Sequence, residues 1–114
     1  MIQENELRLS IEEMMRNLRL AGVDCACMVQ FDRDIPTDTV MKLFDFYEYV
    51  VEHAFDGLTS LLVRFFLRDG DFYACVDAVC IRDLNYLQSE RISVSAEDEN
   101  CYTLSYRIAG GEAK

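Results

Sequence analysis

Two runs of alternating apolar residues, joined by the dipeptide Asp69-Gly70, most strongly constrain how this chain folds. Alternation over residues 59–68 and again over residues 72–79 is typical of strands with one buried face. Asp-Gly suits a two-residue type I′ turn, because both central residues of that turn have positive φ. The sequence therefore predicts a β-hairpin. Its inward side chains would be Leu61, Val63, Phe65 and Leu67 on the first strand and Phe72, Ala74, Val76 and Ala78 on the second.

A second hairpin is predicted near the C-terminus. Residues 92–96 and 102–108 alternate in the same way and flank an acidic turn at residues 97–100. A further strand is predicted over residues 23–31, where Cys25 and Cys27 would share one face. Both hairpins have one apolar face, so we expect the sheet to be packed on that face and wetter on the other.

Apolar residues at three- and four-residue spacing predict two long helices, over residues 3–21 and 37–57. Gly22 is well placed to end the first helix, and Thr37 is the predicted N-cap of the second. A short helix is predicted within residues 82–88. This order is typical of an α+β fold, a two-layer α/β sandwich with a mixed five-stranded sheet and the helices on one face.

We expect residues 1–114 to form a single domain, with a leading helix in residues 1–22 and a frayed tail in residues 109–114. Six residues that lie on the apolar phase of their elements are predicted to share one core. They are Leu43, Phe44, Val51, Leu61, Val63 and Val76.

Charge and composition exclude several classes of function. The formal net charge of −10 argues against nucleic acid and anionic membrane surfaces as partners. No apolar run approaches the length of a membrane span, and the polar opening of the chain is unlike a signal peptide, so a cytoplasmic location is expected. Five cysteines without a C-x-x-C pair, and a lone histidine, predict buried thiols in place of disulfides or zinc.

The wet face of the second long helix carries acids one turn apart. Glu48, Glu52 and Asp56 follow at four-residue intervals, and His53 lies beside them. Such a row has two interpretations, a solvated helix face that needs no ligand or one wall of a binding site. Nothing near His53 in the sequence completes a nucleophilic pair. The spacing alone leaves both interpretations open.

The element order and the run EYVVEHAFDGLTSLLVRFFLRDGDFYACVDAV resemble the ATP-binding domain of sensor histidine kinases, in the GHKL superfamily. In that family the second helix carries a Glu and, four residues on, an Asn that helps hold the magnesium of the nucleotide. Glu48 falls on this Glu and Glu52 on this Asn. The resemblance implies Glu48 as a catalytic base, Glu52 as a metal and cofactor ligand, and His53, Asp56 and Asp77 as further nucleotide-binding residues. ATP and Mg²⁺ would be the cofactors of a working site.

The chain departs from the family pattern in ways that bear on nucleotide binding. After Asp77 it continues Ala78-Val79-Cys80-Ile81, without the glycines that let backbone approach adenine. Only twelve residues separate Val79 from Ile92, too few for an ATP lid that supplies amides and cations to phosphates. The helix acids would also face a polyphosphate. Like charges about 4 Å apart cost roughly 4 kcal/mol at a surface-like dielectric.

Two classes of function follow from the resemblance and its departures. The first is an ATP-binding-domain-like module of a two-component sensor histidine kinase, degenerate, with weak or no nucleotide binding. The alternative is a non-catalytic scaffold that binds a partner protein. The resemblance implies a dimerisation and phosphoacceptor domain and a response regulator as partners, a homodimer as a further option, and a cytoplasmic domain of a membrane-bound receptor as the setting. The chain has no phosphoacceptor histidine in a recognisable context.

Overall fold

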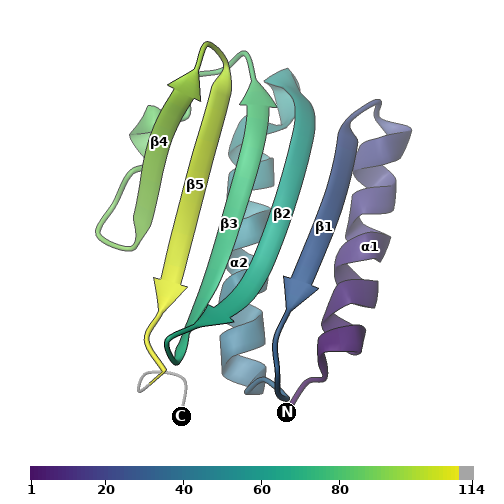
Figure 1. Ribbon diagram of the computed structural model, residues 1–114. Helices are drawn as coiled ribbons and strands as arrows, with labels where there is room; N and C mark the ends of the chain where they lie inside the picture. The colour runs from purple at the N-terminus through teal and green to yellow at the C-terminus, as the bar shows by residue number, and fades with distance from the viewer. Residues whose placement is uncertain (111–114) are drawn as a thin grey trace.

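Helices and strands follow one another in the order predicted from the sequence, and the computed structural model describes residues 1–110 (Figure 1). The elements are α1 (Glu4–Leu20), β1 (Asp24–Gln30), α2 (Thr37–Ala54), the 3₁₀ turn η1 (Phe55–Gly57), β2 (Leu58–Arg68), β3 (Asp71–Cys80), the 3₁₀ turn η2 (Asn85–Leu87), β4 (Ile92–Asp98) and β5 (Cys101–Ile108). Neither long helix offers an apolar stretch of the length that a bilayer crossing needs.

The five strands form one mixed sheet in the order β1-β2-β3-β5-β4. Only β1 and β2 run parallel; the other neighbouring pairs are antiparallel. Asp69 and Gly70 both have positive φ, 53° and 82°, as the predicted type I′ turn requires. The two predicted hairpins are therefore confirmed.

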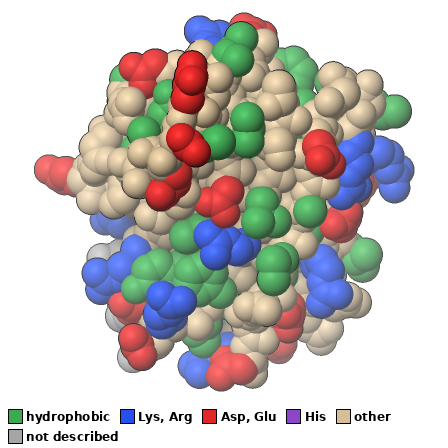
Figure 2. All heavy atoms as spheres, turned by 45° about the horizontal axis from the view of Figure 1, so that its top comes forward, with side chains coloured by type: hydrophobic (Ala, Val, Ile, Leu, Met, Phe, Trp, Pro, Cys, Tyr) green, Lys and Arg blue, Asp and Glu red, His purple; other side chains and the backbone are tan. Residues whose placement is uncertain are grey.

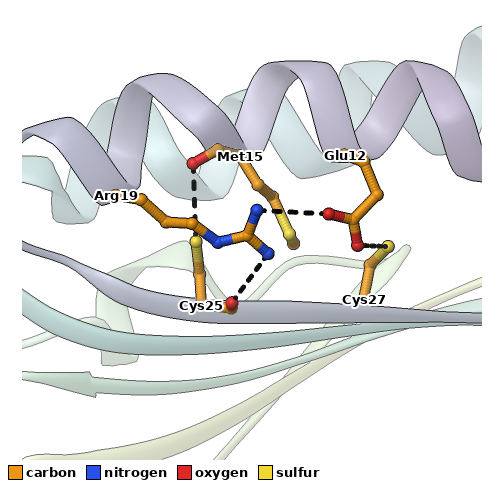
Figure 3. Close-up of polar contacts among 5 residues, drawn as sticks. All are labelled: Glu12, Met15, Arg19, Cys25 and Cys27. Atoms are coloured by element: carbon orange, nitrogen blue, oxygen red, sulfur yellow. Dashed lines mark hydrogen bonds and ion pairs between the residues drawn. The ribbon is translucent and has the colours of Figure 1, made fainter.

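Both long helices lie on the same face of this sheet. Helix α2 crosses behind the central strands, and α1 lies along β1 (Figures 1 and 3). The alternate side chains that the sequence placed inward on β2 and β3 pack beneath α2, and Phe46 of α2 stacks on Tyr106 of β5 with ring centroids 5.3 Å apart. No element within residues 1–110 covers the opposite face. The predicted two-layer sandwich is confirmed.

The apolar stripe of α2 is rotated relative to the sequence prediction. Leu43, like the three predicted core residues on β2 and β3, is fully buried, but Phe44 and Val51 are only partly buried. The side chains that face the sheet in their place are Phe46 and Val50, which are 4% and 0% exposed. Phe44 and Val51 sit on the flank of α2 that faces α1 and pack against the edge of the core, so the prediction that they share the core is met only in part.

The end of α1 follows the predicted geometry. Gly22 has a φ of 91° and follows the C-cap Ala21. Its amide donates to the Arg19 carbonyl at 3.0 Å, and the Val23 amide donates to the Leu18 carbonyl at 3.0 Å. This pair of bonds is a Schellman motif, which satisfies carbonyls that the helix end leaves unpaired.

The start of α2 differs by one residue from the prediction. Pro36 is the N-cap, and Thr37 is already helical, so the assignment of Thr37 as N-cap was wrong. Two backbone bonds of 2.7 Å between Ile2 and Ile35 fix the chain just before the helix. The Thr37 hydroxyl instead accepts a hydrogen bond from the amino group of Met1 at 3.5 Å. The predicted short helix at residues 82–88 is the single 3₁₀ turn η2.

The outer edge of β4 is bonded by the chain segment that precedes it. The Gln88 side chain accepts the Val94 amide at 2.7 Å, and the Ser89 amide donates to the Ile92 carbonyl at 2.9 Å. At the other end of the described chain, the Gly110 amide donates to Asp71 at 3.0 Å. This bond holds the beginning of the segment predicted to fray, and residues 111–114 lie outside the described residues.

Neighbouring valines on α2 provide a test of the helix phase. Val50→Ala should lower the free energy of unfolding by about 2–3 kcal/mol, because it opens a cavity beneath α2, whereas Val51→Ala should cost about 1 kcal/mol. Urea denaturation of the two variants measures the difference. Equal losses, or the larger loss in Val51→Ala, would contradict the observed phase.

Asp71 should make stability depend on pH. The amide of Gly110, and then the Arg107 guanidinium, hold the pKa of Asp71 below its usual value. A depressed folded-state pKa stabilises the fold above the unfolded pKa, and this contribution is lost as pH falls through the folded value. Asp71→Asn should therefore lower Tm at neutral pH, with a deficit that shrinks in acid. Asp69→Asn is the control, since Asn also tolerates positive φ, and its Tm should follow wild type.

Candidate functional site between the two helices

A groove runs between α1 and α2 on the side away from the sheet. It consists of two adjoining hollows of about 370 and 520 Å³ that share Met14, Asn17 and Glu48. We call this feature the interhelical groove. Its lining residues are Ser10, Glu13, Met14, Asn17 and Leu18 from α1, Met41, Phe44, Asp45, Tyr47, Glu48, Val51 and Glu52 from α2, and Phe55 from η1.

The charged side chains of the interhelical groove are all acidic. Glu13, Asp45, Glu48 and Glu52 contribute carboxylates, and no Lys or Arg is among the lining residues. Each of the four is exposed, and none forms an ion pair within residues 1–110. The site therefore combines an apolar floor with an uncompensated negative rim.

The predicted site residues on α2 do not all face this groove. Glu48 and Glu52 line it, as their spacing predicted. His53 points elsewhere, with Nδ1 2.8 Å from the Tyr49 carbonyl oxygen and its ring 4.4 Å from that of Tyr49. Asp56 pairs with Arg82 at 3.1 Å, across the chain segment that follows β3. The structure thus brings Glu48 and Glu52 to one hollow and directs His53 and Asp56 away from it.

Asp77 lies on the opposite face of the sheet from the helices. Its carboxylate accepts hydrogen bonds from Arg64 at 3.2 Å and from the Thr103 hydroxyl at 2.7 Å. Its neighbours on β3, Val76 and Ala78, point into the core beneath α2. The sheet therefore separates Asp77 from Glu48 and Glu52.

The residues present fit a magnesium–nucleotide complex poorly. Within the described residues no three His, Cys, Asp or Glu side chains are grouped so that they could hold a metal ion. The interhelical groove also offers phosphates no cationic side chain. The acids that line it would repel a polyphosphate.

The connection from β3 to β4 is packed against the body of the domain. Leu84, which precedes η2, and Leu87, its last residue, are 0% and 2% exposed. The Ile81 amide donates to the Gly57 carbonyl at 3.1 Å, and a Cβ on Gly57 would lie 2.7 Å from the Ile81 side chain. This connection is anchored to the core at Leu84 and Leu87 and to η1 at Ile81.

The uncovered face of the sheet carries a separate hollow of about 310 Å³. Met28, Arg64, Phe66 and Arg68 are among its lining residues, and the Arg68 guanidinium lies 5.2 Å from the centre of the Phe66 ring. Figure 2 shows basic and apolar side chains interleaved on this face, with acids gathered toward the end where β4 joins β5. The charge of this surface is mixed, unlike that of the interhelical groove.

A polar cluster joins α1 to β1 (Figure 3). The Cys27 thiol donates to Glu12 at 3.2 Å, Arg19 pairs with Glu12 at 3.2 Å, and Arg19 also donates to the Cys25 carbonyl at 3.1 Å. Burial, and then the Glu12 carboxylate, raise the pKa of the Cys27 thiol to about 12. These contacts fasten the helix to the edge strand. Glu12 and Arg19 were not among the site residues predicted from the sequence, although their seven-residue spacing places them on one side of the helix.

Comparison with solved structures shows that this fold occurs in a known protein. The arrangement of two helices on one face of a mixed five-stranded sheet is similar to that of a histidine-kinase catalytic domain. Among solved structures, the nucleotide-free catalytic domain of the histidine kinase ThkA is similar with a TM-score of 0.55 and 9% sequence identity, over 93% of this chain and 90% of that one. No protein-family description and no curated protein matches the sequence. The likeness therefore establishes the fold.

The Cys27 contact has a chemical consequence. At pH 8 a thiol with a pKa of about 12 is ionised in roughly one molecule in ten thousand, and only the thiolate is alkylated readily. Iodoacetamide should therefore modify Cys27 much more slowly in the folded protein than in urea, as followed by peptide mass spectrometry. Glu12→Gln removes the neighbouring charge and should speed the folded-state reaction. Equal rates in the folded protein and in urea would contradict the assignment.

Proposed function

We propose that this chain is a histidine-kinase-ATPase-like domain that binds nucleotide weakly or not at all and serves as a non-catalytic interaction module. One observation carries the proposal. The residues on which nucleotide chemistry would depend are divided between two faces of the sheet, with Glu48 and Glu52 in the interhelical groove and Asp77 bonded to Arg64 and Thr103 on the other side.

Electrostatics support this proposal. A nucleotide in the interhelical groove would bring its phosphates toward four carboxylates without a lining cation. Catalysis of phosphoryl transfer relies on fixed positive charge and amide donors around the phosphates. A single magnesium ion held by Glu52 would have to offset the repulsion from the remaining acids.

The connection between β3 and β4 supports the same proposal. A nucleotide lid needs a segment that can close over phosphates, whereas Leu84 and Leu87 are committed to the core. Repositioning this segment would expose both leucines to water. Burial of such side chains is worth about 1.5–3 kcal/mol each.

In this proposal the domain acts within a two-component system by contacting other proteins. A dimerisation and phosphoacceptor domain or a response regulator would then be bound without phosphate being transferred by this chain. Glu48, which the family pattern would make a base, acts here as a surface carboxylate.

Isothermal titration with magnesium-ATP tests the proposal. We expect a Kd in the millimolar range or weaker, which corresponds to about 4 kcal/mol or less of binding free energy, because the lining of the interhelical groove offers phosphates no cationic side chain. Glu52→Ala should leave this weak binding unchanged, as should the control Glu97→Ala near the end of β4. No phosphorylated protein should form with labelled ATP.

Micromolar affinity that is lost in Glu52→Ala and retained in Glu97→Ala would contradict the proposal. It would indicate a working site in which Glu52 replaces the family's Asn as metal ligand.

A further inference from the structure

We infer that the interhelical groove is a docking site for a cationic amphipathic helix of a partner protein. The inference rests on the proposed function, because it specifies where such an interaction module would bind its partner. It adds the chemistry and the shape of the partner, which neither the fold nor the comparisons supply.

The floor of the interhelical groove exposes apolar surface. Met41 and Phe55 are 57% and 46% exposed, and Met14, Phe44 and Val51 are partly buried against the core. Apolar surface rimmed by polar groups marks interaction sites in soluble proteins. Methionine is flexible and polarisable, so Met14 and Met41 can adjust to the side chains of a partner.

A docking site in the interhelical groove also explains how far the apolar arc of α2 extends around the helix. An apolar arc that served only the sheet would end at the residues that face it, such as Phe46 and Val50. Phe44 and Val51 extend the arc toward α1, where water still reaches them. A helix seated between α1 and α2 would complete their burial.

The negative charge of the interhelical groove favours a positively charged partner. Glu13, Asp45, Glu48 and Glu52 lie along the groove without an ion pair within residues 1–110 and without a lining base. Rows of like charge repel one another, and Lys or Arg side chains from a partner would relieve this repulsion. An acidic partner, or the acidic helical face of a second copy, would increase it.

Shape selects a helix over an extended strand. The lining residues of α2 and η1 run from Met41 to Phe55, which at 1.5 Å per residue is roughly 21 Å, or about four turns of a docked helix. The backbone groups of α1 and α2 are already paired within the helices, so this surface offers an extended peptide no ladder of hydrogen bonds. A helix satisfies its own backbone and presents apolar residues at i, i+3, i+4 and i+7.

The probe is a fluorescein-labelled peptide of about 18 residues, with Leu at i, i+3, i+4 and i+7 and Lys on both flanks of that stripe. Fluorescence anisotropy measures its binding to the full chain at physiological salt. A scrambled peptide of the same composition controls for charge alone. A version with Glu in place of Lys tests the sign of the charge.

Two pairs of variants separate the groove from the overall negative charge. Glu48→Lys with Glu52→Lys reverses charge in the groove. Glu97→Lys near the end of β4, with Glu99→Lys in the turn that follows, makes the same net change at exposed acids. Met41→Ser with Phe55→Ser removes floor contacts. Leu9→Ser with Leu20→Ser removes two α1 side chains that are 62% and 81% exposed and do not line the groove.

We expect the groove variants of both kinds to weaken binding of the Lys peptide by about tenfold or more, while their controls stay within about twofold of wild type. The scrambled and Glu peptides should bind at least as weakly as the groove variants do. The inference is overturned by equal losses in groove and control variants, by equal binding of the scrambled peptide, or by no binding of the Lys peptide. Self-association that Met41→Ser with Phe55→Ser abolishes would also overturn it, because the occupant would then be a second copy.

The titration with magnesium-ATP distinguishes the two proposals. Groove-dependent peptide binding that persists alongside micromolar ATP affinity would refute the proposed function but leave the docking site intact. Weak ATP binding together with loss of the peptide result would refute the docking site alone.

Discussion

The parallel pairing of β1 with β2 is the constraint on which the rest of this structure depends. Two parallel neighbours cannot be joined by a tight turn, so the chain must cross the sheet between them, and α2 is that crossover. Once α2 lies on one face, the apolar sides of β2 and β3 are fixed toward it, and α1 must join it above β1 to bury Cys25 and its neighbours. Two helices side by side on one sheet leave the interhelical groove between them.

Local chemistry made the hairpins predictable, whereas the rotation of α2 depended on its tertiary setting. Asp69-Gly70 specifies its own turn, and alternation specifies which strand residues face inward. On α2 the apolar residues occupy a wide arc, and periodicity alone cannot say which part of it meets the sheet. Phe46 and Val50 face the strands because α1 occupies the flank beside Phe44 and Val51. The start of α2 likewise depends on a tertiary contact, because the backbone bonds between Ile2 and Ile35 fix the chain just before the helix.

Only the part of the candidate site that lies on a single helix could be predicted from the sequence. Helical spacing placed Glu48 and Glu52 on one face, and the structure keeps them together. Strand alternation put Val76 inward and therefore Asp77 outward, so the separation of Asp77 from the helix acids was already implied by the pattern, although the family resemblance grouped them. The contact of Glu12 with Cys27 joins two elements whose relative placement no local pattern encodes.

The two outer strands of the sheet are partly closed by other segments of the same molecule. The Gln88 side chain and the Ser89 backbone amide bond the backbone of β4, and the Arg19 side chain bonds the Cys25 carbonyl on β1. A sheet grows by adding strands to open edges, so these bonds oppose uncontrolled stacking of one copy's edge on another's. Exposed apolar surface such as the floor of the interhelical groove favours contacts between copies, and open sheet edges would let such contacts extend into fibres. With its edges partly closed, the protein can expose the groove while its sheet does not gain strands from other copies.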